Sequence, residues 1–140
     1  MRMLHTMIRV LDLDRALAFF DVLGFREVRR RDSERGRFTL VFLDSGDESD
    51  SHMIELTHNW DEAEPYSDGR NFGHIAIAVE DIYDMCERLE AHGVQILRPP
   101  RDGRMAFVRS PDQISIELLQ AGEALPLKEP WVSMASTGTW

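Results

Sequence analysis

The chain has little cysteine, no long apolar run and few basic residues. Cys86 is the single cysteine among 140 residues, and one cysteine cannot form an intrachain disulfide, so a disulfide-stapled extracellular scaffold is excluded. No apolar stretch approaches the roughly 20 residues that a transmembrane helix needs. The opening segment reaches the polar His5 almost at once, so we expect no signal peptide, no membrane partner and a cytoplasmic location.

Acidic residues outnumber basic ones, and the chain is short. Its 25 Asp and Glu residues against 16 Lys and Arg residues give a formal charge of −9. Binding to DNA or RNA needs a cationic surface, so nucleic acid is excluded as a partner. A small anionic ligand is compatible with this charge, because a few arginines that lie close together can hold one. The length suits one compact domain or two very small fused units.

Three residues of the first half recur 69 positions later in the second half. The matched pairs are His5 and His74, Asp12 and Asp81, and Gly24 and Gly93. Three polar or special residues that match without a gap indicate duplication of one structural unit, not a short solenoid repeat. We predict a single domain over residues 1–140, with repeats at about 1–60 and 71–120 and an irregular tail at 121–140. Trp131 and Trp140 in this tail are expected to pack on the body or on a partner chain.

Each half is predicted to fold as β-α-β-β-β, which makes the fold class α+β. Residues 5–10 and 73–79 read as strands, an aspartate then caps a helix, and a glycine ends it. Three strands are predicted after each helix: Phe25–Arg30, Arg37–Leu43 and His52–His58 in the first half, and Val94–Leu97, Met105–Arg109 and Ser115–Leu119 in the second. The acidic segment 44–51 is predicted to form a hairpin loop.

The first and last strand of each half share one face pattern, because side chains in a strand point alternately to its two faces. One face is aliphatic in all four strands and is expected to lie under a helix. The other face carries one candidate metal ligand per strand: His5, Glu55, His74 and Glu117. A mid-strand carboxylate between apolar residues is costly to bury unless it is paired or ligated, and a divalent cation would ligate it. The alternative is that these are solvated residues on the open face of an antiparallel sheet; their duplicated positions favour a metal site.

Four segments of the chain resemble glyoxalase I of the vicinal oxygen chelate superfamily, especially its short proteobacterial form. They are L-H-T-M-I-R-V at 4–10, I-E-L-T-H-N-W at 54–60, N-F-G-H-I-A at 71–76 and S-P-D-Q-I-S-I-E-L at 110–118. The resemblance covers residues 1 to about 120 and implies two βαβββ repeats, with the sheet curved around a metal site and the helices on the outer face. It also implies a homodimer with sites at the subunit interface, where His5 and Glu55 of one chain and His74 and Glu117 of the other hold one ion with two waters. This class of enzyme implies Ni²⁺, and the ligand chemistry also allows Co²⁺ or Zn²⁺.

The resemblance further implies the reaction. The substrate is the hemithioacetal of methylglyoxal and glutathione, and a proton moves from C1 to C2 through an enediolate to give the thioester S-lactoylglutathione. The metal acts as a Lewis acid on the two vicinal oxygens, Glu117 is the expected base, and Glu55 serves the opposite face of the substrate. Four polar residues are expected to contact glutathione, each with a solvated surface residue as the alternative: Arg9, Asn59, Arg70 and Arg104.

Two positions depart from the family pattern, and other members of the fold remain rival hypotheses. Gln113 stands where the turn usually has glycine, and His58 replaces a residue that is more often tyrosine. The rivals are an extradiol dioxygenase, a methylmalonyl-CoA epimerase, a fosfomycin thiol transferase and a non-enzymatic drug-binding module of the bleomycin-resistance type. Glu55 argues against the dioxygenase, whose chemistry needs that position open, and against the epimerase, which resembles this pattern with an amide there. The thiol transferase needs only three protein ligands and the drug-binding module binds without metal, so four intact ligands favour glyoxalase I.

Overall fold

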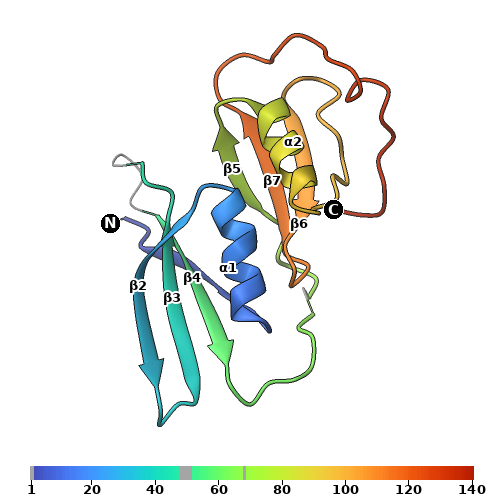
Figure 1. The fold of residues 1–140 in the computed structure, drawn as a ribbon. Helices are drawn as coiled ribbons and strands as arrows, with labels where there is room; N and C mark the ends of the chain where they lie inside the picture. Colours follow the sequence, from blue (N-terminus) through green and yellow to red (C-terminus); the bar gives the residue numbers. More distant parts are fainter. Residues whose placement is uncertain (1, 48–51, 68) are drawn as a thin grey trace. The chain divides into compact units, whose positions relative to one another are not determined.

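The computed structural model describes residues 2–47, 52–67 and 69–140, and the chain forms two compact units, Met1–Ser67 and Asp68–Trp140 (Figure 1). Each unit holds one sheet and one helix, so the predicted α+β class is confirmed. Positions 48–51 of the predicted hairpin loop lie outside the described residues. Within the described part of the chain, no helix is long and apolar enough to cross a membrane.

The first unit has the predicted β-α-β-β-β order. Its elements are β1 (His5–Arg9), α1 (Leu13–Val22), β2 (Arg26–Ser33), β3 (Phe38–Asp44) and β4 (Met53–Asn59). The strand order in the sheet is β1-β4-β3-β2, with β1 parallel to β4 and the other neighbours antiparallel. The parallel pair places the first and last strands of the repeat side by side, which brings their polar faces together.

The second unit repeats this plan with one strand fewer. Its elements are β5 (Ile75–Val79), α2 (Ile82–Ala91), β6 (Met105–Arg109) and β7 (Ser115–Gln120). They form a sheet in the order β5-β7-β6, again with the first and last strands parallel. The strand predicted over Val94–Leu97 is wrong: the described residues form no ladder there, and the contact with β6 consists of a hydrogen bond from the Leu97 N–H to the Phe107 carbonyl at 2.9 Å and an isolated bridge between Arg98 and Phe107. Pro99 and Pro100 follow at once, and proline has no N–H to continue the ladder.

Both helices begin and end at the residues that the repeat predicts. Asp12 Oδ1 accepts a hydrogen bond from the Arg15 N–H at 3.0 Å. Asp81 Oδ1 accepts from two backbone N–H groups of the first turn of α2, at 2.9 and 3.0 Å. Gly24 and Gly93 follow the two helices with φ of +99° and +78°. The duplication in the sequence is therefore a duplication of local structure.

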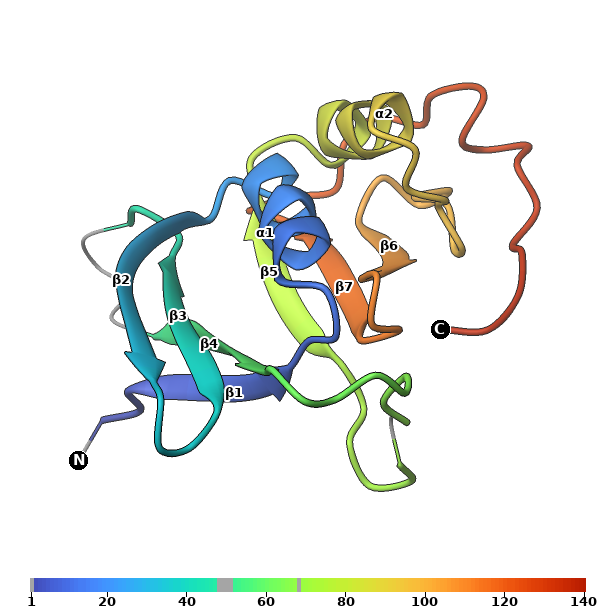
Figure 2. The same cartoon turned by 60° about the horizontal axis from the view of Figure 1, so that its bottom comes forward.

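One face of each sheet is apolar and buried. In the first unit the strands and the residue that follows β1 bury six aliphatic side chains, on the face beside which α1 lies (Figure 2): Ile8, Val10, Val41, Leu43, Ile54 and Leu56. In the second unit β6 and β7 bury Val108, Ile116 and Leu118 on the side of α2, whose own buried face includes Cys86 and Leu89. The opposite faces of both sheets are left for polar groups.

The segment after β7 contains neither helix nor strand within residues 121–140, but it packs on the second unit. Trp131 is buried with 1% exposure, so it packs on the body. The Tyr83 hydroxyl on α2 donates to the Pro126 carbonyl at 2.9 Å, and the Thr137 N–H donates to the Leu97 carbonyl at 2.8 Å. These contacts hold the tail against both α2 and the Leu97 segment that lies beside β6.

Candidate metal and substrate site

The first half-site consists of His5, Phe42 and Glu55 on the open face of the first unit. Glu55 on β4 pairs with Met7 on β1 and with Phe42 on β3, so these side chains share one face. His5 lies two positions before Met7 on the same face of β1. Its Nε2 atom lies 3.1 Å from Glu55 Oε2, and its ring meets the Phe42 ring edge-on at a centroid distance of 5.5 Å.

The second half-site has the same construction from His74, Phe107 and Glu117. Glu117 on β7 pairs with Ala76 on β5 and with Phe107 on β6. His74 Nε2 lies 3.0 Å from Glu117 Oε2, and the His74 and Phe107 rings meet edge-on at 5.5 Å. The histidine, the glutamate and the supporting ring therefore recur as one unit of structure.

In both half-sites the carboxylate is shielded and the imidazole is open. The side chains of Glu55 and Glu117 are 12% and 15% exposed, whereas those of His5 and His74 are 37% and 43% exposed. A carboxylate at this depth needs a positive partner or a cation. The partly exposed imidazole nitrogen leaves room for an ion to approach both donor atoms from solvent.

Glu55 and Glu117 differ in the hydrogen bonding of Oε1, the carboxylate oxygen that does not face the histidine. Glu55 Oε1 accepts a hydrogen bond from the Thr57 hydroxyl at 3.4 Å. Leu119 occupies the matching position, two residues after Glu117, and has no donor. Among the described residues, His74 is the polar partner of Glu117. The second carboxylate is thus less restrained than the first.

Each unit alone brings together two side chains that could ligate a metal, one histidine and one glutamate. Within residues 2–47, 52–67 and 69–140, no group of three or more His, Cys, Asp or Glu side chains gathers at one point. Two imidazole nitrogens and two carboxylate oxygens form a donor set that suits Ni²⁺, Co²⁺ or Zn²⁺. Within each half-site, the close approach of Nε2 to Oε2 would let both atoms ligate the same ion.

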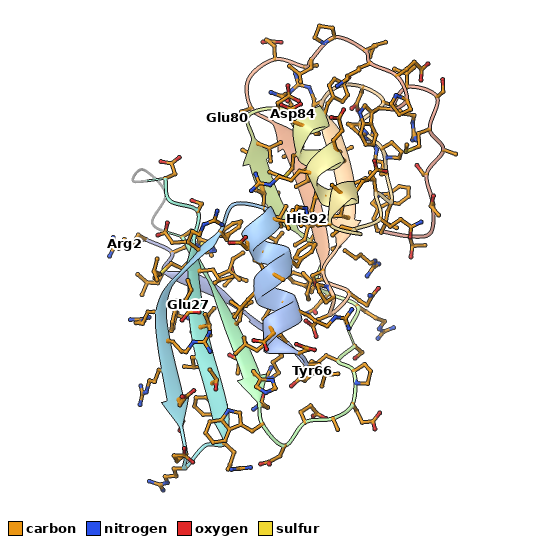
Figure 3. All side chains as sticks on the ribbon, viewed as in Figure 1. Arg2, Glu27, Tyr66, Glu80, Asp84 and His92 are labelled. Atoms are coloured by element: carbon orange, nitrogen blue, oxygen red, sulfur yellow. The ribbon has the colours of Figure 1, made fainter. Side chains whose placement is uncertain are left out.

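The predicted glutathione contacts divide between the units. Arg9 is exposed on the same face of β1 as His5, and Asn59 ends β4 on the face of Glu55. The Tyr66 hydroxyl, labelled in Figure 3, donates to Asn59 Oδ1 at 3.4 Å. Arg70 is exposed in the turn before His74. Arg104 is exposed one position before β6, and its carbonyl accepts from the Gln120 N–H at 2.8 Å, so it is in register with Gln120 and not with Glu117.

Several residues of these faces were not predicted from the sequence. Phe42 and Phe107 support the two histidines, the Arg29 guanidinium carbon lies 3.8 Å from the centroid of the Phe42 ring, and the Trp140 ring lies 6.1 Å from that of Phe107. The strand register is needed to find them, because the two phenylalanines do not keep the offset of 69 positions. Arg29 and Arg98 do keep it, and each pairs with the phenylalanine of its half-site.

Cys86 takes no part in either half-site. It is fully buried in α2, and burial raises the pKa of its thiol to about 12. A thiol with that pKa is not a thiolate near neutral pH and cannot serve as a nucleophile. Cys86 is therefore a packing residue of α2.

Comparison with known proteins identifies the family. The family model described as Glyoxalase/Bleomycin resistance protein/Dioxygenase superfamily matches residues 2–118. The chain is 48% identical over 126 residues to a lactoylglutathione lyase of Neisseria meningitidis, covering 86% of this chain and 91% of that protein. The structure is similar to the trypanothione-dependent glyoxalase I of Leishmania major, with a TM-score of 0.79, 44% identity and 86% of each chain covered. It is also similar to glyoxalase I of Zea mays, with a TM-score of 0.78 and 35% identity over 87% of this chain and 45% of that one. The chain therefore belongs to the Glyoxalase/Bleomycin resistance protein/Dioxygenase superfamily, and within it to the glyoxalase I family.

Proposed function

We propose that the chain is a glyoxalase I that converts the hemithioacetal of methylglyoxal and glutathione to S-lactoylglutathione. The observation that carries this proposal is the pair of matching His–Glu half-sites, 3.1 and 3.0 Å between donor atoms, in a chain 48% identical to a lactoylglutathione lyase. The reaction moves a proton from C1 of the hemithioacetal to C2, and the hydroxyl-bearing C1 becomes the thioester carbonyl.

The half-sites would hold one divalent ion between them, with Ni²⁺ as the proposed native metal. Each unit alone offers two ligands, whereas an ion of this kind takes four or more. We propose that two chains form a homodimer and that His5 and Glu55 of one chain meet His74 and Glu117 of the other, where the sheets curve around the ion. Bound there, the ion supplies Lewis-acid stabilisation of negative charge on the two vicinal oxygens of the substrate.

Glu117 is the proposed base. Its carboxylate lacks the hydroxyl donor that Thr57 gives to Glu55, so it can turn from its histidine toward the substrate at a smaller cost. The removed proton stays on the Glu117 carboxyl and returns to the neighbouring carbon. The more restrained Glu55 keeps its place as a ligand and faces the other side of the substrate.

The open face of the first unit suits the glutathione portion of the substrate. Arg9 is exposed there and can bind a carboxylate in a bidentate manner. The Asn59 amide, whose oxygen accepts from Tyr66, has N–H donors left for a peptide carbonyl. Arg70 and Arg104 are proposed as further contacts to the carboxylates. The reduced, unpaired Cys86 fits the cytoplasm as the proposed location.

The proposed function is tested by the rate of thioester formation from methylglyoxal and glutathione with Ni²⁺-loaded protein. His74→Ala is expected to lose both metal and turnover, because it removes the imidazole of the second half-site. His92→Ala is the matched control, since His92 is exposed at the end of α2 (Figure 3) and its imidazole bonds only the Arg88 carbonyl among the described residues. Absence of thioester from the unmodified chain, or full turnover by His74→Ala, would contradict the proposal.

The shared site is tested by mixing two inactive variants. One carries His5→Ala and Glu55→Ala, and the other carries His74→Ala and Glu117→Ala. If every site takes one half-site from each chain, a mixed dimer has one site with all four ligands intact. Co-refolding the two variants is therefore expected to restore activity that neither has alone. No recovery, with mixed dimers shown to form, would place each site within one chain.

A further inference from the structure

Arg29 lies on the open face of the first unit, next to the first half-site. It pairs with Phe42 across β2 and β3, and Phe42 pairs with Glu55, so all three side chains share one face. The guanidinium carbon lies 3.8 Å from the centroid of the Phe42 ring, whose own neighbour is the His5 ring at 5.5 Å. The distance from the Arg29 guanidinium carbon to the centre of the His5 ring therefore cannot exceed the sum of these two distances.

The charge of Arg29 has no counter-ion in the described part of the chain. The arginines on either side of it in the strand are paired: Arg26 with Asp21, and Arg30 with Glu27, both at 2.7 Å. Alternation places Arg31 on the same face as Arg29, and both are exposed. An acidic chain of net charge −9 therefore presents unpaired arginines on the face that carries metal ligands.

We infer that Arg29 binds a carboxylate of the thiol part of the substrate, an inference that rests on the proposed function. The Phe42 ring supports the guanidinium and limits its motion, while the N–H groups at its edge can form two parallel bonds to a carboxylate. In a cysteinyl peptide, a carboxylate lies one or two residues from the sulfur, which is about 3.5–7 Å of extended chain. The path from the His5 ring through Phe42 to Arg29, made of 5.5 and 3.8 Å, is of the same order.

Arg29 and its neighbour Arg30 lie on the same strand but point to opposite faces of the sheet. Arg30 points to the other face and is held by Glu27 (labelled in Figure 3) through two hydrogen bonds of 2.8 and 2.7 Å. Arg30→Gln removes the same charge from the same strand and leaves the open face unchanged. It is the matched control for Arg29→Gln.

The test measures how tightly Ni²⁺-loaded protein binds S-methylglutathione and its dimethyl ester, by calorimetry. Arg29→Gln is expected to weaken binding of the free acid roughly fivefold, the effect of about one exposed charge pair, and to leave binding of the ester unchanged. Arg29→Lys keeps the charge but loses the planar arrangement of N–H donors, so its affinity for the free acid is expected to lie between that of the unmodified protein and that of Arg29→Gln. Arg30→Gln is expected to match the unmodified protein with both ligands, and metal content is measured for each variant.

Four outcomes would overturn the inference alone. Equal losses for Arg29→Gln and Arg30→Gln would mean that only the general charge of the protein matters. An equal loss for the acid and the ester would give Arg29 a packing role on Phe42, and so would loss of Ni²⁺ from Arg29→Gln. If the unmodified protein binds neither ligand and forms no thioester, the proposed function fails together with the inference. If the unmodified protein binds the free acid and Arg29→Gln binds it equally tightly, only the inference fails.

Discussion

Replacing Gly103 with alanine should destabilise the protein far more than the same change at Gly24. Both glycines have positive φ, +64° and +99°, so alanine at either position costs about 1–2 kcal/mol of backbone strain. Around Gly24 a β-carbon would meet no atom within 4 Å, but at Gly103 it would lie 2.2 Å from the Leu125 carbonyl oxygen. Since Leu125 is held by its own N–H bond to the Gly103 carbonyl at 3.0 Å, the tail must move away. Such overpacking adds about 1–3 kcal/mol.

The expected loss in the free energy of unfolding is therefore about 2–5 kcal/mol for Gly103→Ala and about 1–2 kcal/mol for Gly24→Ala. Urea titration, followed by the fluorescence of the buried Trp131 and by circular dichroism, measures both. The Trp131 signal should change before the helix signal in Gly103→Ala, because the tail is displaced first. Equal losses for the two variants would refute the close packing of the tail against Gly103.

Three further predictions concern groups outside the half-sites. The Cys86 thiol, whose pKa burial raises to about 12, should resist a thiol reagent at pH 8 in the folded protein and react at once in urea; fast reaction of the native protein would contradict its burial. Gln113→Gly should raise the free energy of unfolding by about 0.5 kcal/mol, measured by urea titration. Gln113 has a φ of +66°, which strains a residue with a side chain but not glycine. Relief of this strain is expected to exceed the stability that glycine loses through its greater freedom in the unfolded chain. Burial opposes ionisation of Asp102, but hydrogen bonds from Arg98 and from two backbone N–H groups outweigh it and lower its pKa. Its contribution is therefore present above the ordinary carboxyl pKa and is lost as pH falls through the lowered value. Asp102→Asn should lower the free energy of unfolding by about 1 kcal/mol at pH 7, a value reduced because Asp102 is partly exposed. The variant's melting temperature should also fall less between pH 5 and pH 2 than that of the unmodified protein. An equal fall in both proteins would contradict this role of Asp102.

Much of the fold could be predicted because local rules and long-range packing agree in this chain. The recurrence of His, Asp and Gly located both strand-to-helix junctions, and alternation sorted ligand faces from apolar faces. The absence of a strand at Val94–Leu97 could not be predicted, because the apolar residues of this stretch suit a strand while the prolines that follow limit its pairing to an isolated bridge.

The supporting groups of the half-sites depend on strand register, which the sequence does not reveal by spacing alone. Phe42 and Phe107 come beside their histidines only through the antiparallel pairings with β4 and β7. The stacking of Arg29 on Phe42 depends further on an irregularity in the pairing of β2 with β3, between Glu27 and Arg29. Alternation counted from the start of that strand would assign the arginines to the wrong faces.

The central claim is that His5, Glu55, His74 and Glu117 together hold one ion, and the number of ions bound per chain tests it most directly. Metal-stripped protein is titrated with Ni²⁺ while bound metal and the rate of thioester formation are followed together. Both curves are expected to break at one equivalent per chain, because each chain carries four ligands and each ion uses four. A break at two equivalents, one for each His–Glu pair, or binding that no thioester formation accompanies, would contradict it.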